Sequence, residues 1–243
     1  MAPHGAKDDS NVRSGEGLQR LDDLAELAAR VGSIVNYSRS GSVFLIDDFE
    51  GGLDKWRTKT GPAGGEVVVD NSRTFGGRVS CKLTTGAGVD PYAYIGKWMP
   101  IPPVSRLGLA ATVSIDDDME YLHWQIDFAE GLVSYNYRVQ YWRTTGILTY
   151  NDPLWGFVPI GEPGLMDDDT PSFHNGKLVV DMTSKEYVRF EFDNVTYDLS
   201  GYLGPTGVFD GILLSQFVIY AEAVNPGPAD AWIDNLVLTY NEF

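Results

Sequence analysis

The feature that most constrains this chain is an alternation of apolar and polar side chains with a period of two. Residues 121–128 place an apolar side chain at every second position, and residues 133–142 repeat the pattern with aromatic side chains. Because successive side chains of a β-strand point to opposite faces, each segment buries one face and turns the other to solvent or to a partner. Turn residues recur at short intervals elsewhere, so the pattern predicts an all-β fold of about twelve to fourteen strands.

Two segments near the ends of this pattern are expected to be its first and last strands. Residues 43–56 run from four apolar side chains into a cluster of acids and a two-glycine turn. Residues 231–240 alternate between apolar and polar side chains up to the end of the pattern. If these two strands pair, the chain between them closes into a single β-sandwich domain.

Residues 1–32 are expected to form a separate arm and helix. Residues 1–17 are polar and charged with no apolar period, a composition that alone favours disorder. Residues 18–31 place apolar side chains at helical spacing, and Gly32 follows as a stop signal. The helix either packs on the sandwich or docks a partner chain, and the residues expected to make that partner contact are Leu18, Leu21, Leu24 and Ala28.

Charge and composition exclude several classes of protein. The formal net charge is −16, whereas nucleic-acid binding draws its affinity from Lys and Arg, so nucleic acid is set aside as a partner. No run approaches the roughly 18 apolar residues of a membrane-spanning helix, so no membrane insertion is expected. The one cysteine, Cys81, excludes an internal disulfide and is expected to be a small buried hydrophobe. No signal peptide is visible near Met1, so we expect synthesis in the cytoplasm.

Three segments resemble jelly-roll carbohydrate-binding modules: residues 47–56 (DDFEGGLDKW), 74–86 (TFGGRVSCKLTTG) and 231–240 (AWIDNLVLTY). Residues 174–202 are similar to the paired strands of concanavalin-like, laminin-G-type lectin sandwiches. The resemblance covers about a third of the chain and consists of common strand and turn types, so it implies a fold more than a ligand. The implied fold is a jelly-roll or concanavalin-like β-sandwich over residues 33–243, preceded by the extended arm and one α-helix.

In jelly-roll modules a structural calcium ion commonly ties the first strand to the last, and the resemblance implies the same here. The acids at the matching positions are Glu50 and Asp234, and Asp48 and Asp47 are further candidates. Carboxylate oxygens from both ends of the chain, completed by backbone carbonyls, would suit the preference of Ca²⁺ for oxygen ligands. The alternative is that these acids end turns and accept hydrogen bonds from backbone amides.

Residues 125–130 (QIDFAE) are similar to the E-x-D-x-x-E signature of concanavalin-like retaining glycosidases. Gln125 occupies the position of the nucleophile, and an amide cannot form the glycosyl ester that a retaining mechanism needs. Residues 191–193 begin the same pattern, but Thr196 stands where the third acid belongs. The three histidines have no metal-ligand spacing, and His123, on a polar strand face, is expected at the surface. We therefore expect no catalysis and no cofactor other than the calcium.

The first of two functions that remain open is a structural protein of a larger assembly. A lectin-like sandwich without an export signal, preceded by an arm and a helix, suits a phage capsid decoration protein or another virion surface protein. Such a protein would be made in the cytoplasm, associate with copies of itself or with other structural chains, and be incorporated into a virion.

The alternative function is that of a carbohydrate-binding module, whose partner is a glycan. Exposed aromatic rings provide stacking surfaces for sugar rings, and neighbouring amides and acids exchange hydrogen bonds with the hydroxyl groups. The expected ligand-binding residues are Tyr135, Tyr137, Trp142 and Trp155, with Tyr92 as a further candidate. Aromatic rings exposed together on one concave face would favour glycan binding, whereas burial against another copy would favour assembly.

Overall fold

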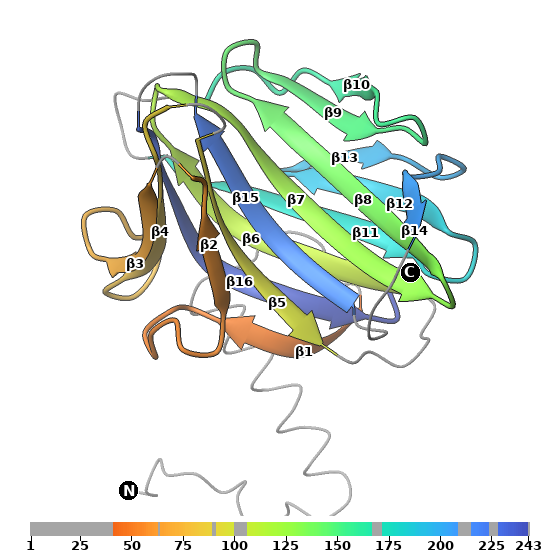
Figure 1. Cartoon of the computed structure of the whole chain (residues 1–243), viewed down its shortest axis with the longest axis horizontal. Helices are drawn as coiled ribbons and strands as arrows, with labels where there is room; N and C mark the ends of the chain where they lie inside the picture. Colours follow the sequence, from red (N-terminus) through yellow and green to blue (C-terminus); the bar gives the residue numbers. More distant parts are fainter. Residues whose placement is uncertain are drawn as a thin grey trace, which may run out of the picture. The chain divides into compact units, whose positions relative to one another are not determined.

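Two antiparallel β-sheets make up the fold (Figure 1). The computed structural model describes residues 41–62, 64–88, 91–99, 106–166, 172–208, 215–223 and 228–242. These residues contain sixteen strands, so the predicted all-β sandwich is confirmed for this part of the chain. The expected arm and helix, with the docking residues Leu18, Leu21, Leu24 and Ala28, lie outside the described residues.

The first sheet has eight strands in the order β13-β12-β11-β6-β16-β4-β3, with β1 paired to β16. Its strands are β1 (Ser42–Asp47), β3 (Gly65–Asp70), β4 (Ser80–Thr85), β6 (Arg106–Ile115), β11 (His174–Asp181), β12 (Glu186–Phe192), β13 (Val195–Asp198) and β16 (Asp230–Tyr240). Its central neighbours β6 and β16 lie far apart in the sequence, so the register of the sheet depends on long-range pairing.

The second sheet also has eight strands, in the order β10-β9-β8-β7-β15-β5-β2, with β14 paired to β8. Its strands are β2 (Arg57–Thr60), β5 (Tyr92–Met99), β7 (Met119–Glu130), β8 (Val133–Trp142), β9 (Ile147–Asn151), β10 (Phe157–Gly161), β14 (Thr206–Val208) and β15 (Ser215–Ala223). In Figure 1 the strands β7, β8 and β15 lie in front of the strands of the first sheet.

The pairing of the first and last predicted strands is confirmed. β1 runs antiparallel to β16, from Ser42 opposite Tyr240 to Asp47 opposite Leu236. The indole N–H of Trp56 donates a hydrogen bond to the buried carboxylate of Asp47, and the ring is itself buried. The first strand is therefore held to the sandwich by backbone pairing and by an aromatic anchor just beyond its end.

The core between the sheets is formed by the apolar positions of the alternating strands. In β7, Leu122, Trp124 and Ile126 are completely buried, and the indole of Trp124 packs edge-on against Phe190 of β12. Gly176 of β11 has no side chain because an added Cβ would collide with the Trp124 ring. Cys81 is also completely buried, which confirms the expectation of a structural cysteine.

Residues 151–175 are rich in proline, glycine and aspartate, a composition typical of a long loop, yet they contain the strand β10. β10 forms the edge of the second sheet beside β9, and the register of this pair shifts between Pro159 and Gly161. Proline is tolerated at an edge because one side of an edge strand needs no hydrogen-bonding partner. The apolar residues of this segment were therefore a strand signal that its proline and glycine content concealed.

Candidate functional site

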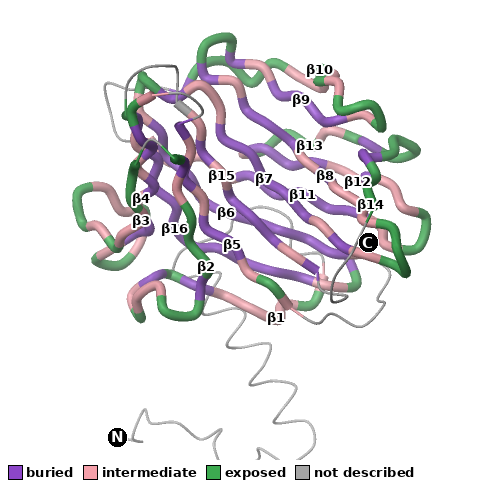
Figure 2. Tube along the Cα trace, in the orientation of Figure 1, coloured by how far each residue is buried: buried purple, intermediate pink, exposed green. Residues whose placement is uncertain are grey.

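The outer face of the second sheet consists of the alternate residues of β5, β7, β8 and β15 that point away from the core. Because Leu122, Trp124 and Ile126 point into the core, His123 and Gln125 must point outward. The outer face is nevertheless well buried along β7 (Figure 2), because its side chains cover one another. The side chains on this face are therefore largely shielded from water although they lie outside the core.

His123 lies at the centre of the outer face and is only 2% exposed, so its expected surface position is wrong. Its imidazole lies nearly parallel to the rings of Tyr121 and Tyr220, at ring-centroid distances of 6.0 Å and 4.5 Å. Neither ring nitrogen has a hydrogen-bond partner among the described residues. Burial, helped by the charge of Arg138, lowers the pKa of His123 well below its usual value, although the neighbouring Gln125 side chain opposes the shift. At neutral pH the ring is uncharged and offers one donor and one acceptor.

Three polar side chains continue this cluster along β7 and β8. Gln125 donates a hydrogen bond from Nε2 to Oδ2 of Asp127, whereas Oδ1 of Asp127 and Nε of Arg138 have no partner among the described residues. Burial raises the pKa of Asp127 to about 6, although the hydrogen bond from Gln125 and the charge of Arg138 oppose the shift. The centre of the outer face thus holds several buried hydrogen-bonding atoms that the fold itself does not satisfy.

An aromatic ladder borders this cluster on the β5 side. Tyr92 and Tyr94 of β5 both stack against Tyr220 of β15, at centroid distances of 5.3 Å and 6.3 Å. The hydroxyl groups of Tyr121 and Tyr220 both donate to Glu222, the latter at 3.0 Å. Burial is the largest cause that raises the pKa of Tyr121 and of Tyr220, with Glu222 adding to it, so both phenols stay protonated.

Exposed aromatic rings lie on both sides of the polar cluster. Trp98 on β5 is 48% exposed, and Trp155 beyond β9 is 45% exposed. The guanidinium of Arg138 lies 5.1 Å from the ring centre of Trp155, which places this indole over the outer face. Phe157, which is 53% exposed, packs edge-on against Trp142. The outer face therefore combines a polar centre with aromatic borders.

The backbone around Trp155 is held in an unusual conformation. Its φ angle is +64°, in the left-handed region that non-glycine residues rarely adopt. Oδ1 of Asp152 accepts hydrogen bonds from the backbone N–H groups of Leu154 and Gly156, at 2.9 Å and 2.7 Å. The turn between β9 and β10 is thus fixed by one carboxylate, which sets the position of the exposed indole.

The predicted ligand-binding residues divide between two faces of the second sheet. Trp142 and Trp155 lie on the outer face, as does Tyr92. Tyr137 is 0% exposed and Tyr135 packs against the core, where both rings stack on Phe128. Their assignment as exposed stacking surfaces is therefore corrected. The two tyrosines share the face of Val139 and Tyr141, and alternation along β8 carries all four side chains toward the core.

The acids expected to bind calcium lie near the turn of residues 71–79. Oδ2 of Asp234 accepts backbone hydrogen bonds from Phe75 and Gly76, at 2.9 Å and 3.1 Å. Glu50 accepts the backbone N–H of Arg78 and pairs with its guanidinium at 3.0 Å. The backbone bond from Arg78 is the largest cause that holds the pKa of Glu50 below its usual value.

The other acids named for calcium also have partners within the fold. Oδ1 of Asp48 accepts the backbone N–H of Glu50 at 3.1 Å, and Asp47 bonds to Trp56 and Lys55. Burial, with the nearby charge of Asp48, raises the pKa of Asp234 despite its amide bonds. No group of three His, Cys, Asp or Glu side chains suited to a metal ion occurs among the described residues. These carboxylates accept hydrogen bonds from backbone amides, as in the alternative derived from the sequence. Calcium binding stays a prediction.

The glycosidase-like residues 125–130 do not assemble the geometry of their signature. Gln125 and Asp127 point to the outer face. Because the register of β7 with β8 is regular, Glu130 lies on the opposite face of the strand. Its carboxylate pairs with Nζ of Lys185 at 2.8 Å. The third carboxylate is therefore turned away from the other two positions.

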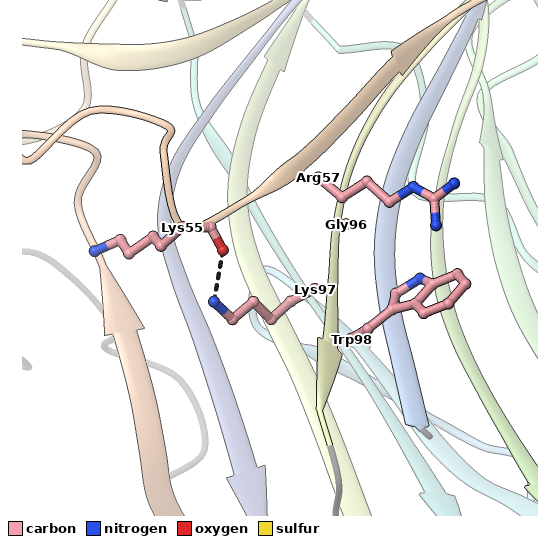
Figure 3. A pocket seen from close by; sticks show the side chains of 5 residues that line it. All are labelled: Lys55, Arg57, Gly96, Lys97 and Trp98. Carbon is pink, nitrogen blue, oxygen red and sulfur yellow. Dashed lines mark hydrogen bonds between the residues drawn. The ribbon is translucent and has the colours of Figure 1, made fainter. Parts of the chain in front are cut away.

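A pocket opens at the edge of the outer face, between β2 and β5 (Figure 3). It has a volume of about 270 Å³ and is lined by Lys55, Arg57, Gly96, Lys97 and Trp98. Sequence reasoning missed this pocket because its residues come from two separate strands. It missed the cluster around His123 because a polar strand face is usually solvent-exposed.

The fold places this chain among β-sandwiches of the jelly-roll type. The chain matches no protein-family model and no curated protein sequence. Similar solved structures include an endo-β-1,4-glucuronan lyase from the fungus Trichoderma reesei (TM-score 0.57, 14% identity, 82% of this chain and 95% of that chain). They also include the cellulose induced protein Cip1 (TM-score 0.56, 16% identity, 81% and 97%). A sialidase matches over 83% of this chain with TM-score 0.55 and 14% identity, but this chain spans only 19% of the sialidase.

These likenesses show the shared fold. Among the described residues, no helix has the length and hydropathy needed to cross a membrane.

Proposed function

We propose that this chain is a carbohydrate-binding protein whose outer face on the second sheet binds a saccharide. The observation that carries the proposal is a set of buried polar atoms without partners, on His123, Asp127 and Arg138, between exposed tryptophans. An unsatisfied buried polar group costs roughly 1–3 kcal/mol, so a ligand that satisfies these groups recovers free energy on binding.

The chemistry of a saccharide suits both parts of this surface. The C–H faces of a sugar ring stack on exposed indoles such as Trp98 and Trp155, and its hydroxyl groups both donate and accept hydrogen bonds. The neutral imidazole of His123 likewise offers a donor and an acceptor, and Arg138 offers a charged donor. A purely apolar ligand would leave these polar atoms unsatisfied.

The names of the similar structures support the same proposal. A glucuronan lyase, a cellulose induced protein and a sialidase are all named for a saccharide or for action on one. We propose binding without catalysis, because Gln125 replaces the carboxylate nucleophile and Glu130 is paired with Lys185. The role of a virion structural protein depends on residues 1–32 and remains a separate prediction.

The proposal can be tested by measuring saccharide binding to the full chain and to two variants. The probes are neutral and acidic polysaccharides in affinity gel electrophoresis, followed by calorimetry with oligosaccharides of those retained. Trp155→Ala should weaken binding about tenfold, the scale of one lost aromatic contact. Phe75→Ala removes a comparably exposed ring from the turn of residues 71–79 and should bind as wild type. Binding of no saccharide, or equal binding by both variants, would overturn the proposal.

A further inference from the structure

The pocket between β2 and β5 gathers positive charge on a strongly acidic chain. The chain has 34 Asp and Glu against 18 Lys and Arg, yet Lys55, Arg57 and Lys97 line this one pocket beside Trp98. We propose that the pocket binds the carboxylate or sulfate group of an anionic saccharide. The inference rests on the proposed function of the outer face and names the class of its ligand.

Arg57 is arranged to receive such an anion. Its guanidinium lies 4.6 Å from the ring centre of Trp98, and Figure 3 shows the two side chains on the same side of β5. Among the described residues no carboxylate pairs with Arg57. Stacking on an indole fixes the plane of the guanidinium but leaves its in-plane N–H groups available, and these match two oxygens of a carboxylate or sulfate.

Lys55 and Lys97 contribute unequally to the positive charge of the pocket. Nζ of Lys55 pairs with Asp47 at 2.9 Å, so its charge is compensated. Nζ of Lys97 donates to the backbone carbonyl of Lys55 and faces no carboxylate among the described residues. Figure 3 shows Lys97 and Lys55 directed away from the Arg57 and Trp98 pair. Lys97 therefore contributes by long-range attraction, whereas Arg57 is the contact residue.

Gly96 allows the neighbouring strand β15 to approach β5 closely. It lies on the outer face between Tyr94 and Trp98, and an added Cβ would lie 3.3 Å from both the Phe217 carbonyl oxygen and Cγ2 of Val218. The same Cβ would lie 3.7 Å from Nε2 of Gln216. The atoms around Gly96 are thus a backbone carbonyl oxygen, a methyl group and an amide nitrogen, and Gly96 lies opposite Arg57 in the pairing of β2 with β5.

The nearest outer-face carboxylates do not cancel this charge. Gln216, not an acid, lies opposite Trp98 on β15, and Asp127 lies one strand further, near Arg138. Glu222 lies opposite Tyr92, at the other end of β5 from Trp98, where two phenols donate to it. An anionic group at Arg57 would therefore meet attraction without a facing carboxylate.

The test compares saccharides that differ only in charge. Calorimetry on the full chain uses cellohexaose, its C6-carboxylated form and its C6-sulfated form, and a galacturonate hexasaccharide beside its methyl ester. At low salt we expect the charged member of at least one set to bind about tenfold tighter than its neutral parent. This preference should fall with added salt, as expected for an exposed ion pair. Inorganic sulfate alone serves as the probe for anion binding without a saccharide.

Two variants test whether the preference for charged over neutral saccharides comes from this pocket. Arg57→Gln should remove the roughly tenfold preference, measured as the ratio of charged to neutral saccharide binding within the same variant, because the charged contact is lost. Arg78→Gln is the control, since it removes an exposed arginine charge from the turn of residues 71–79, where the backbone N–H still bonds to Glu50.

Each outcome separates this inference from the proposed function. Equal binding of charged and neutral saccharides overturns the anion pocket and leaves the saccharide-binding face intact. A charge preference that survives Arg57→Gln, or that Arg78→Gln also removes, overturns the assignment to this pocket. Inorganic sulfate that binds as tightly as the sulfated saccharide would show a simple anion site. Binding of no saccharide overturns the proposed function itself.

Discussion

The outer faces of the two sheets differ in whether their buried polar side chains have hydrogen-bonding or ionic partners. On the first sheet, Nζ of Lys177 pairs with Glu242 at 2.7 Å, and Arg189 bridges Glu242 and Glu191 at 2.8 Å and 2.6 Å. On the second sheet, His123 and Arg138 keep buried nitrogen atoms without partners among the described residues. A satisfied network stabilises a fold, whereas unsatisfied buried groups cost free energy unless something else meets them.

Two histidines illustrate the same difference. Nδ1 of His174, at the start of β11, lies 2.8 Å from Asp193, and its Nε2 lies 3.3 Å from Ser172. His123, on β7, packs against the rings of two tyrosines, and both of its nitrogens lack a hydrogen-bond partner among the described residues. The first side chain is explained by the fold alone. The second becomes explicable if a ligand completes its hydrogen bonds.

The largest expected effect comes from breaking the network of the first sheet. Glu242→Gln should lower the free energy of unfolding by about 3–5 kcal/mol, because it leaves Lys177 and Arg189 buried without their shared carboxylate. The measurement is equilibrium denaturation in guanidinium chloride. Glu222→Gln on the second sheet is the matched control, since an amide oxygen can still accept from the two tyrosines. An equal loss in both variants would contradict the contrast between the faces.

Calcium provides the next test of the first sheet. An ion held by Asp48, Glu50 and Asp234 would raise the free energy of unfolding by about 2.7 kcal/mol at a hundredfold excess over its Kd. Thermal unfolding after chelation and after addition of calcium measures this directly, with Asp234→Asn as the variant that should not respond. A melting temperature independent of calcium would contradict the predicted ion and leave the carboxylates as acceptors of amide hydrogen bonds.

His123 should make the stability of the second sheet depend on pH. Burial lowers its pKa in the folded state, so below pH 6.5 the unfolded chain binds a proton that the folded chain does not. The wild type should therefore lose up to about 1.4 kcal/mol per pH unit through this group on acidification below pH 6.5, and His123→Leu should not.

The effect of His123 must be taken as the difference in free energy of unfolding between wild type and His123→Leu. This is because Asp127 changes the stability with pH in the opposite direction. Its pKa is raised to about 6, so its contribution to stability is present at low pH and is lost as the pH rises through that value. At pH 7.5 His123→Leu should be at least as stable as wild type, because no hydrogen bond among the described residues is lost. A variant with the same pH profile as wild type would show that the imidazole is not held neutral.

The smallest effect on the sandwich is expected from removing residues 1–32. If these residues are an assembly element, light scattering should find a defined oligomer for the full chain and a monomer for the truncated one. The unfolding transition of the sandwich should change little, because its core lies within residues 41–242. Two monomers would remove the main support for an assembly role. Unchanged saccharide binding by the truncated chain would place the binding surface within the sandwich.

Local pattern was sufficient to predict much of the fold. The alternation in β7 and β8 indicated strands, and the apolar residues near positions 43–46 and 231–240 indicated the β1 and β16 pairing, because both follow from side-chain period and turn residues. The strand β10 was missed because its proline suggested a loop. The sequence alone could therefore predict which side chains share a face of a strand.

The amino-acid sequence by itself determined an all-β sandwich beyond residue 32 whose first and last strands pair, with Tyr137 and Arg138 on opposite faces of one strand. Only the tertiary structure decided that Tyr137 faces the core and that His123 is buried on the outer face. Only the pairing of β2 with β5 brought Arg57 beside Trp98. The physical reason is that a period of two is a local property, whereas burial and the meeting of strands depend on contacts between residues far apart in the chain.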